Sequence, residues 1–165
     1  MSIQEIVILQ GGELSSDIAH QLESKIKSKC SLNIKVISMS KTKEFKSLTE
    51  TSTATTLAIF IVQTIENELP PEDAGPCIRF YKRKTHPNDL LAEKFQFSVL
   101  GLGDSNLLLD RQHTAAKDCN QVAQALDARF EALGGSRFYD RGEADERTGL
   151  TEVDPWIDGL VAKLA

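Results

Sequence analysis

The chain has 165 residues, of which 41% are hydrophobic and 26% are charged, and its formal net charge is −5. This composition is typical of a globular chain with a sizeable core, so we expect residues 1–165 to form a single domain. The acidic balance argues against nucleic-acid binding, and no apolar run reaches the roughly 20 residues that cross a bilayer. The N-terminus lacks the basic and apolar regions of a secretory signal. We therefore expect an intracellular, cytoplasmic protein that binds neither nucleic acid nor membrane.

The cysteines and histidines give no sign of a metal centre. Cys30, Cys77 and Cys119 are far apart and odd in number, which is typical of reduced thiols in a packed interior. No CxxC pair occurs, and no histidine lies at a metal-ligand spacing from Cys, Asp or Glu. We expect no metal site.

Apolar runs and helical periods alternate in the first part of the chain. Residues 6–9 form a continuous apolar run, which predicts a strand covered on both faces. A helix is expected next, because residues 15–17 supply capping side chains before an apolar stripe. Residues 32–36 alternate between apolar and polar, which predicts a strand nearer the sheet edge. The stretch 38–56 is rich in Ser, Thr and Lys and is expected to be a loop with one amphipathic turn.

The middle of the chain predicts two more buried strands, at 57–62 and 95–100. A loop closed by Pro70-Pro71 leads from the first of them into a helix through Tyr81. The second strand runs into the sequence GLGDSN at 101–106.

The C-terminal part predicts two helices and one short strand. Apolar residues recur at helical spacing from Cys119 to Leu133, and two glycines then end the helix. A short strand is expected at 137–139, followed by an ion-rich surface turn at 140–147. In the last helix, Trp156 lies on the buried stripe.

Strand–helix alternation on this rhythm predicts an α/β fold, a parallel sheet with helices on both faces. Five strands suit the order 2-1-3-4-5, in which ligands bind beyond the carboxyl ends of the strands. Periodicity alone does not separate this order from other doubly wound sheets.

Four motifs in the second half follow one another in a characteristic order. They are GLGDSN at 101–106, LDARFEALG at 126–134, GEADE at 142–146 and PWIDGL at 155–160. The series resembles the FMN-binding, flavodoxin-like domain of the diflavin reductase family, of the cytochrome P450 reductase and methionine synthase reductase type. The resemblance implies a flavodoxin-like five-stranded parallel sheet and a reductase domain C-terminal to this segment. In that family the domain relays single electrons from a flavin–NADPH module to a protein acceptor.

The resemblance also implies three FMN loops, and this sequence departs from the family pattern in each. The first is a Ser/Thr-rich turn with a central glycine that cradles the phosphate. Here Gln10, Gly12 and Leu14 stand at the hydroxyl positions, and Glu13 replaces the glycine. A glutamate turned inward, about 5 Å from a phosphate of charge near −2, would cost roughly 6 kcal/mol at an effective dielectric of 20. We therefore expect Glu13 to point outward if a phosphate is bound.

Two interpretations of the first loop remain open. Gly11, Gly12, Ser15 and Ser16 can form a shifted phosphate cradle. In the alternative, which we favour, the glycines make the turn and the serines cap the helix.

The second and third loops are altered as well. The second keeps Thr64, but glutamates at 66 and 68 replace two glycines that allow close backbone approach. The third keeps residues 101–106, but Leu107 replaces an aromatic residue that stacks on the flavin ring. The run Leu107–Leu109 closes an empty pocket if it is buried, and forms a docking patch if it is exposed.

Because all three loops have lost ligand-binding residue types, we expect a domain that has lost FMN and has no catalytic residue. Its expected role is protein interaction or assembly through an acidic loop edge of Glu13, Glu66, Glu68 and Asp104, with Leu107–Leu109 as the apolar centre. The alternative is an FMN-binding one-electron carrier that works with an NADPH/FAD reductase module. The resemblance then implies FMN contacts at Gln10, Gly11, Gly12, Ser15, Thr64, Gly101, Gly103, Asp104, Ser105 and Asn106.

Overall fold

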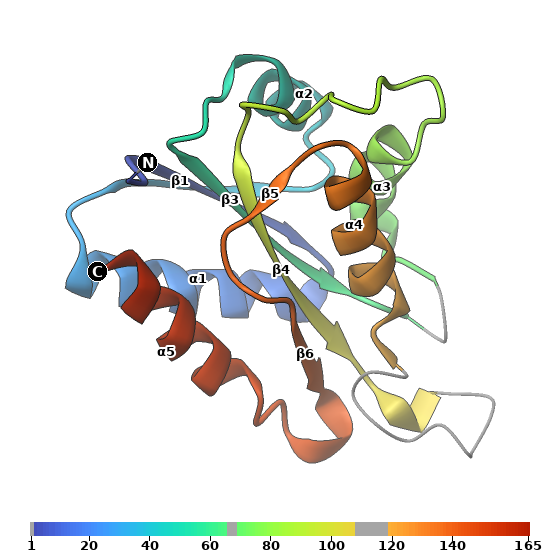
Figure 1. Ribbon diagram of the computed structural model, residues 1–165. Coiled ribbons are helices and arrows are strands. Elements are labelled where there is room, and N and C mark those ends of the chain that lie inside the picture. The colour runs from blue at the N-terminus through green and yellow to red at the C-terminus, as the bar shows by residue number, and fades with distance from the viewer. Residues whose placement is uncertain (1, 66–68, 108–118) are drawn as a thin grey trace.

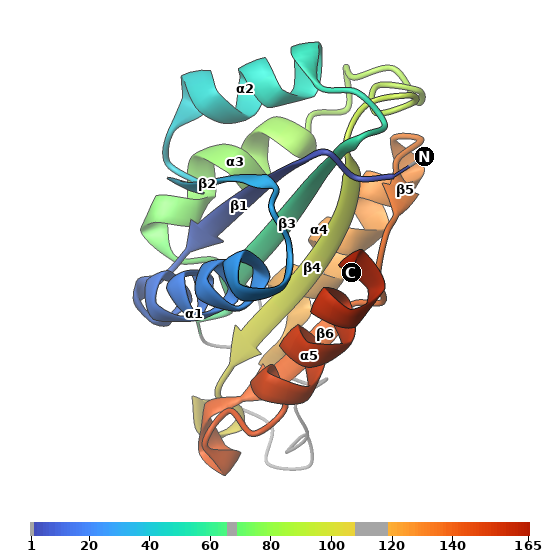
Figure 2. The same ribbon diagram turned by 90° about the vertical axis from the view of Figure 1, so that its left-hand side faces the viewer.

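The computed structural model describes residues 2–65, 69–107 and 119–165, with only the backbone of Leu107. A central parallel sheet is covered by helices on both faces (Figures 1 and 2). The sheet order is β2-β1-β3-β4-β5, and a further strand, β6, also pairs with β4. The predicted order 2-1-3-4-5 is thus confirmed.

The strands are β1 Glu5–Gly11, β2 Asn33–Ser38, β3 Thr56–Gln63, β4 Gln96–Gly103, β5 Ser136–Arg137 and β6 Gly142–Asp145. The helices are α1 Glu13–Lys29, α2 Thr42–Thr51, α3 Gly75–Tyr81, α4 Gln121–Ala132 and α5 Val153–Leu164. Short 3-10 turns occur at η1 Glu72–Ala74, η2 Ser105–Leu107 and η4 Glu146–Thr148.

Two hydrophobic cores lie on opposite faces of the sheet. Side chains of β1 alternate between them, because successive residues of a strand point to opposite faces: Val7 and Leu9 to one core, Ile6 and Ile8 to the other. Helices α2, α3 and α4 cover the first core, and α1 and α5 cover the second (Figures 1 and 2). The continuous apolar run at 6–9 is therefore buried on both faces, as predicted.

Aromatic rings fill the first core. The Phe130 ring of α4 lies 4.6 Å from the Phe60 ring and 4.9 Å from the Tyr81 ring, measured between centroids. The buried Tyr81 hydroxyl is satisfied by Thr49 of α2, with 2.8 Å between the two oxygens. Contacts of this kind hold α2, α3 and α4 together on one side of the sheet.

The loop predicted at 38–56 is wrong over much of its length, because α2 occupies Thr42–Thr51. Phe45, Leu48 and Thr49 are buried at helical spacing against the first core. The Ser and Thr residues of this segment have weak helix propensity, and packing of its apolar face against the core supplies the missing stability.

The fifth position in the sheet is divided between two short strands. β5 pairs with the start of β4, and β6 pairs with its end, through Leu100–Gly142 to Gly103–Asp145. The surface turn predicted at 140–147 is therefore wrong for its middle, where Ala144 and Asp145 are buried. Gly142 makes this pairing possible, because a Cβ there would lie 2.4 Å from Trp156 Cδ1. Trp156 is buried, as its stripe predicted.

Candidate functional site

The three loops that the resemblance implicates follow β1, β3 and β4. The carboxyl ends of these parallel strands meet at one edge of the sheet, which is where ligands bind in this class of fold (Figure 1). The described residues of the three loops are therefore neighbours in space, and their hydrogen bonds decide what the edge can hold.

In the first loop, two backbone amides at the start of α1 donate to side chains from other parts of the chain. The N–H of Gly12 donates to Asp73 Oδ1 at 2.9 Å, and the N–H of Leu14 donates to Gln63 Oε1 at 2.8 Å. Both acceptors come from distant parts of the chain, Asp73 from η1 and Gln63 from the last position of β3. Amides at a helix N-terminus are the groups that bind an anion such as a phosphate.

The predicted serine cap of α1 is wrong. The helix begins at Glu13 with Gly12 as its N-cap, so residues 15–17 lie inside its first turns. The Ser15 side chain is buried, and its hydroxyl donates to the carbonyl of Gly11 at 2.7 Å rather than facing an empty cradle. Glu13 is exposed, in the first turn, where a negative charge suits the helix dipole.

Gln10 contributes its backbone to this loop, since its carbonyl accepts from the Met39 amide at 2.9 Å. The two glycines that follow permit close packing. A Cβ at Gly11 would lie 2.6 Å from Ala74 Cβ, and a Cβ at Gly12 would lie 2.2 Å from Gln63 Oε1. Gly12 also has φ +108°, which other residues rarely adopt. The loop is thus shaped by its own neighbours, η1 and Gln63.

In the second loop, Thr64 ties three elements together. Its amide donates to the Leu102 carbonyl at 3.0 Å, and its Oγ1 accepts from the amide of Val122 at 3.1 Å, near the start of α4. Ile65 and Leu69 form an isolated antiparallel bridge, and their side chains are 41% and 57% exposed. Glu66 and Glu68 lie outside the described residues.

In the third loop, the glycines serve packing of the chain that leads into α4. A Cβ at Gly103 would lie 2.3 Å from the Cys119 carbonyl oxygen, and one at Gly101 would lie 2.6 Å from Ala123 Cβ. Asp104 is half-buried and accepts from the amide of the exposed Asn106 at 2.9 Å. The Leu107 side chain and residues 108–118 lie outside the described part, so the fate of Leu107–Leu109 stays a prediction.

Asp145, which sequence reasoning assigned to a surface turn, organises the third loop. Its Oδ1 accepts from the amides of Ser105 at 2.9 Å and Arg147 at 3.0 Å, and only 2% of the residue is exposed. Burial works to raise the pKa of Asp145, but the hydrogen bonds from Ser105 and Arg147 outweigh it and lower the pKa. The carboxylate is therefore held ionised inside the loop.

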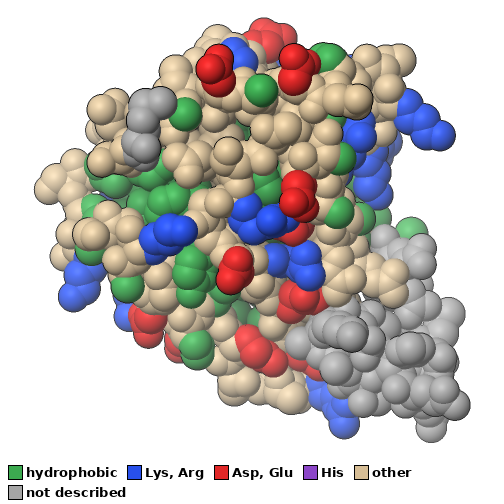
Figure 3. All heavy atoms as spheres, in the orientation of Figure 1, with side chains coloured by type: hydrophobic (Ala, Val, Ile, Leu, Met, Phe, Trp, Pro, Cys, Tyr) green, Lys and Arg blue, Asp and Glu red, His purple; other side chains and the backbone are tan. Residues whose placement is uncertain are grey.

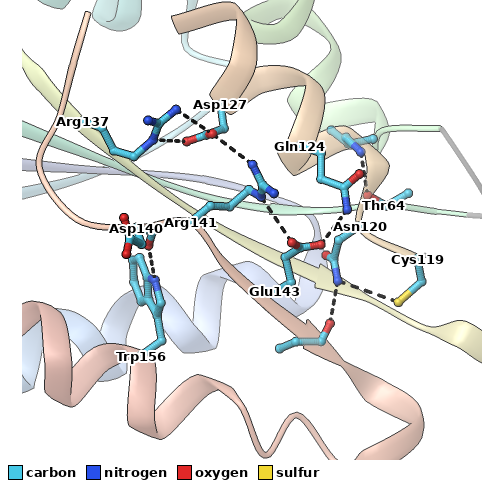
Figure 4. A network of polar contacts seen from close by, with 12 residues as sticks. Thr64, Cys119, Asn120, Gln124, Asp127, Arg137, Asp140, Arg141, Glu143 and Trp156 are labelled. Atoms are coloured by element: carbon cyan, nitrogen blue, oxygen red, sulfur yellow. Dashed lines mark hydrogen bonds and ion pairs between the residues drawn. The ribbon is translucent and has the colours of Figure 1, made fainter. Parts of the chain in front are cut away.

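A second polar network, also missed from the sequence, joins α4 to β5 and β6 (Figure 4). The buried Asp127 carboxylate accepts from Arg137 at 2.9 and 3.1 Å and from Arg141 at 3.0 Å. Arg141 also pairs with Glu143 at 3.3 Å, and Gln124 donates to Glu143 at 2.6 Å. The hydrogen bond that Arg137 donates to Asp127 raises the pKa of Arg137. Acidic and basic side chains are interspersed over this face (Figure 3).

Within residues 2–65, 69–107 and 119–165, no three His, Cys, Asp or Glu side chains are placed to hold a metal ion. In the same ranges, no helix is long and apolar enough to cross a membrane. The side chains of Cys77 and Cys119 are buried, and Cys30 is half-buried. Burial raises the pKa of the Cys77 thiol, so it is poorly nucleophilic.

In the first loop, groups of the kind that bind a phosphate are hydrogen-bonded within the chain. Two of its amides already donate to Asp73 and Gln63, and the Ser15 hydroxyl is turned to the backbone. A phosphate seated on these amides would have to displace a carboxylate of the same sign of charge. The glycines Gly101 and Gly103 face the segment leading into α4.

Comparisons with known proteins agree with this architecture. The flavodoxin family model matches residues 14–156. Methionine synthase reductase of Bos taurus is 40% identical over 113 residues, which are 68% of this chain and 15% of that protein. NADPH oxidoreductase A of Dictyostelium discoideum is 32% identical over 165 residues, covering 96% of this chain and 23% of that protein.

The fold comparison points the same way. A flavodoxin from Pseudomonas aeruginosa, solved as a cysteine-to-serine mutant, superposes with a TM-score of 0.69 at 16% identity, covering 98% of this chain and 99% of that one. The chain thus spans only a small part of the curated relatives and nearly all of a flavodoxin. It belongs to the flavodoxin family, as a domain related to those of the diflavin reductases.

Proposed function

We propose that this chain is one flavodoxin-like domain that does not hold FMN in the phosphate loop of its family and acts instead by docking to protein partners. One observation carries the proposal: the Gly12 and Leu14 amides, at the start of α1, donate to Asp73 and Gln63. Members of the flavodoxin family normally bind FMN, so this arrangement is a departure from the family's role.

The electrostatics of the loop oppose phosphate binding. If the Asp73 carboxylate stayed about 5 Å from a phosphate of charge near −2, repulsion would amount to roughly 6 kcal/mol at an effective dielectric of 20. If it moved away, the Gly12 amide would exchange one charged acceptor for another with little gain. The exposed Glu13 adds a further negative charge to the same turn.

The docking half of the proposal rests on the same edge of the sheet. Ile65 and Leu69 are the large hydrophobic side chains that stand exposed among the described residues. Exposed apolar side chains on an edge that also carries acidic residues such as Glu13 are typical of a surface that meets a partner with basic residues around an apolar patch. The partner we propose is a reductase module, because the relatives are much longer proteins that include diflavin oxidoreductases.

The cofactor half is tested by titrating FMN with the purified protein and following quenching of flavin fluorescence. We expect no saturable quenching at micromolar protein, with the apo form of a flavodoxin as the positive control. Saturable quenching in that range, or a purified sample that is already yellow, overturns the proposal.

The docking half is tested in trans with methionine synthase reductase from which the segment matching this chain has been removed. The double variant Ile65→Ser/Leu69→Ser is expected to weaken binding at least tenfold, measured by calorimetry, while Ala162→Ser on α5 leaves it unchanged. Equal binding by both variants contradicts docking through this edge.

The second candidate function is one-electron transfer through bound FMN, in concert with an NADPH/FAD reductase module. Family membership favours it, as does a relative named NADPH-dependent diflavin oxidoreductase 1, from Dictyostelium discoideum, which is 31% identical over 111 residues. The retained sequence at 101–106 favours it as well. The same FMN titration separates the two functions, because an electron carrier must bind the flavin first.

A further inference from the structure

We infer that Gln63 and Asp73 form an internal clasp that takes the place of a phosphate at the start of α1. The clasp consists of these two side chains and the amides that they accept from, those of Leu14 and Gly12. The inference rests on the proposed function, since a loop that bound FMN would use the same amides. It adds the reason why the loop would not bind a phosphate, namely that two identified side chains accept hydrogen bonds from its amides.

Both arms of the clasp are held on well-packed elements. Gln63 ends β3, where its backbone is paired in register with Leu102 of β4. Asp73 lies in η1, beside Ala74, which is completely buried in the first core. The two hydrogen bonds span 61 and 49 residues of sequence and are part-buried. The packing of β3 and η1 therefore fixes the positions of both acceptors relative to the first loop.

The two glycines of the loop match the two arms of the clasp. A Cβ at Gly12 would meet Gln63 Oε1 at 2.2 Å, so a larger residue there excludes Gln63 from its present position. A Cβ at Gly11 would meet Ala74 Cβ at 2.6 Å and Met39 Sδ at 2.9 Å, so Gly11 lets η1 approach. At position 12, where the resemblance implies a hydroxyl residue, this chain has a glycine, which leaves room for the Gln63 side chain. The present position of the Gln63 side chain thus requires a glycine at position 12.

The clasp also provides hydrogen-bond acceptors for amides at the start of α1, as a bound anion would. The first amides of an α-helix have no partner within the helix and carry the positive end of its dipole. Gly12 itself supplies no side-chain cap to α1, which has 17 residues. The Asp73 carboxylate and the side-chain oxygen of Gln63 act as acceptors instead, so two of the first amides of α1 are satisfied by the chain itself.

The test compares the clasp-free variant Gln63→Ala/Asp73→Ala with a matched control, Gln21→Ala/Glu72→Ala. The control removes an exposed glutamine and an exposed carboxylate from α1 and η1 without touching the loop amides. Hydrogen exchange of the Gly12 and Leu14 amides is measured by NMR. Binding is measured as the rise in Tm with inorganic phosphate and as quenching of FMN fluorescence.

We expect amide exchange at Gly12 and Leu14 to speed up at least tenfold in the clasp-free variant alone. Phosphate should raise its Tm more than that of the wild type or the control, and its affinity for FMN should be at least tenfold higher. Unchanged exchange, or a response to both anions equal to that of the wild type, overturns the clasp. Tight FMN binding by the wild type overturns the proposed function, whichever way the variant behaves.

A second variant keeps the inference falsifiable if the clasp-free chain does not fold. Asp73→Asn retains an oxygen acceptor for Gly12 but removes the negative charge. We expect a folded protein in which phosphate and FMN bind more tightly than to the wild type, though less tightly than to a clasp-free chain. Equal anion binding by Asp73→Asn and the wild type contradicts the clasp.

Discussion

Two loops at the carboxyl edge of the sheet are each closed by an aspartate, but the two aspartates differ in burial and in the number of amides they accept. Asp145 is 2% exposed and accepts from two amides in the third loop, those of Ser105 and Arg147. Asp73 is half-buried and accepts from one amide in the first loop, that of Gly12. Removing a buried carboxylate leaves several donors without an acceptor, so it should cost more stability than removing a half-buried carboxylate that has a single donor.

The two loops also differ in what their residues do. In the third loop, where the sequence at 101–106 agrees with the family, the glycines and Asp145 serve the packing around β4 and the chain leading into α4. In the first loop, the side chains of Asp73 and Gln63 accept hydrogen bonds from the amides of Gly12 and Leu14 at the start of α1.

The largest expected effect is that of Asp145→Ala. It leaves the amides of Ser105 and Arg147 without their charged acceptor in a buried loop, so we expect a loss of about 3 kcal/mol in the free energy of unfolding. Urea denaturation measures it, with the exposed Glu146→Ala as the control, expected within about 0.5 kcal/mol of wild type. A loss no larger than that of Asp73→Ala would break the comparison between the two loops.

Gly12→Ala tests how tightly the first loop is shaped by Gln63. Backbone strain at φ +108° and the contact with Gln63 Oε1 together should destabilise the protein by about 2 kcal/mol. In a Gln63→Ala background the same substitution should be less harmful by about 1 kcal/mol, because only the strain remains. Additive effects in this double-mutant cycle would show that the glycine and the glutamine are independent.

Asp73→Ala is expected to have a smaller effect, about 1 kcal/mol, comparable to the loss of a helix cap. The neighbouring Glu72→Ala serves as the control, since Glu72 is exposed. Thermal unfolding at neutral pH measures both variants. If Asp73→Ala costs as much as Asp145→Ala, the first loop is as firmly built as the third.

The smallest effect is a pH dependence that belongs to Asp145. Its pKa is lowered below the ordinary value of 3.8, so its contribution to stability is fully present above that pH and is lost as the pH falls through the lowered pKa. Below about pH 4, the unfolding free energy of Asp145→Asn should therefore fall less steeply with decreasing pH than that of the wild type. The difference in slope should correspond to at most about one proton taken up on unfolding. Equal slopes for the two proteins would contradict the lowered pKa.

Sequence patterns predicted most of the fold because the patterns are local. The apolar run at 6–9, the helical stripe of α5 and the order of the motifs indicated the sheet, its order and its covered faces. The helix α2 was missed because its stability comes from packing of Phe45 and Leu48 against a core built by other segments. The divided fifth strand was missed because Gly142 and Trp156 make room for it only when they meet.

By itself, the sequence determined the class of fold and the family, because residue type and spacing are sufficient for each. Only the tertiary structure decided which residues far apart in the sequence meet. Asp73 accepts a hydrogen bond from the amide of Gly12, which is 61 residues away in the sequence. Asp127 of α4 accepts hydrogen bonds from Arg137 of β5 and from Arg141, which directly precedes β6. Spacing along the chain does not encode contacts of this kind, because hydrogen bonds require that donor and acceptor be brought within about 3 Å by the packing of whole elements.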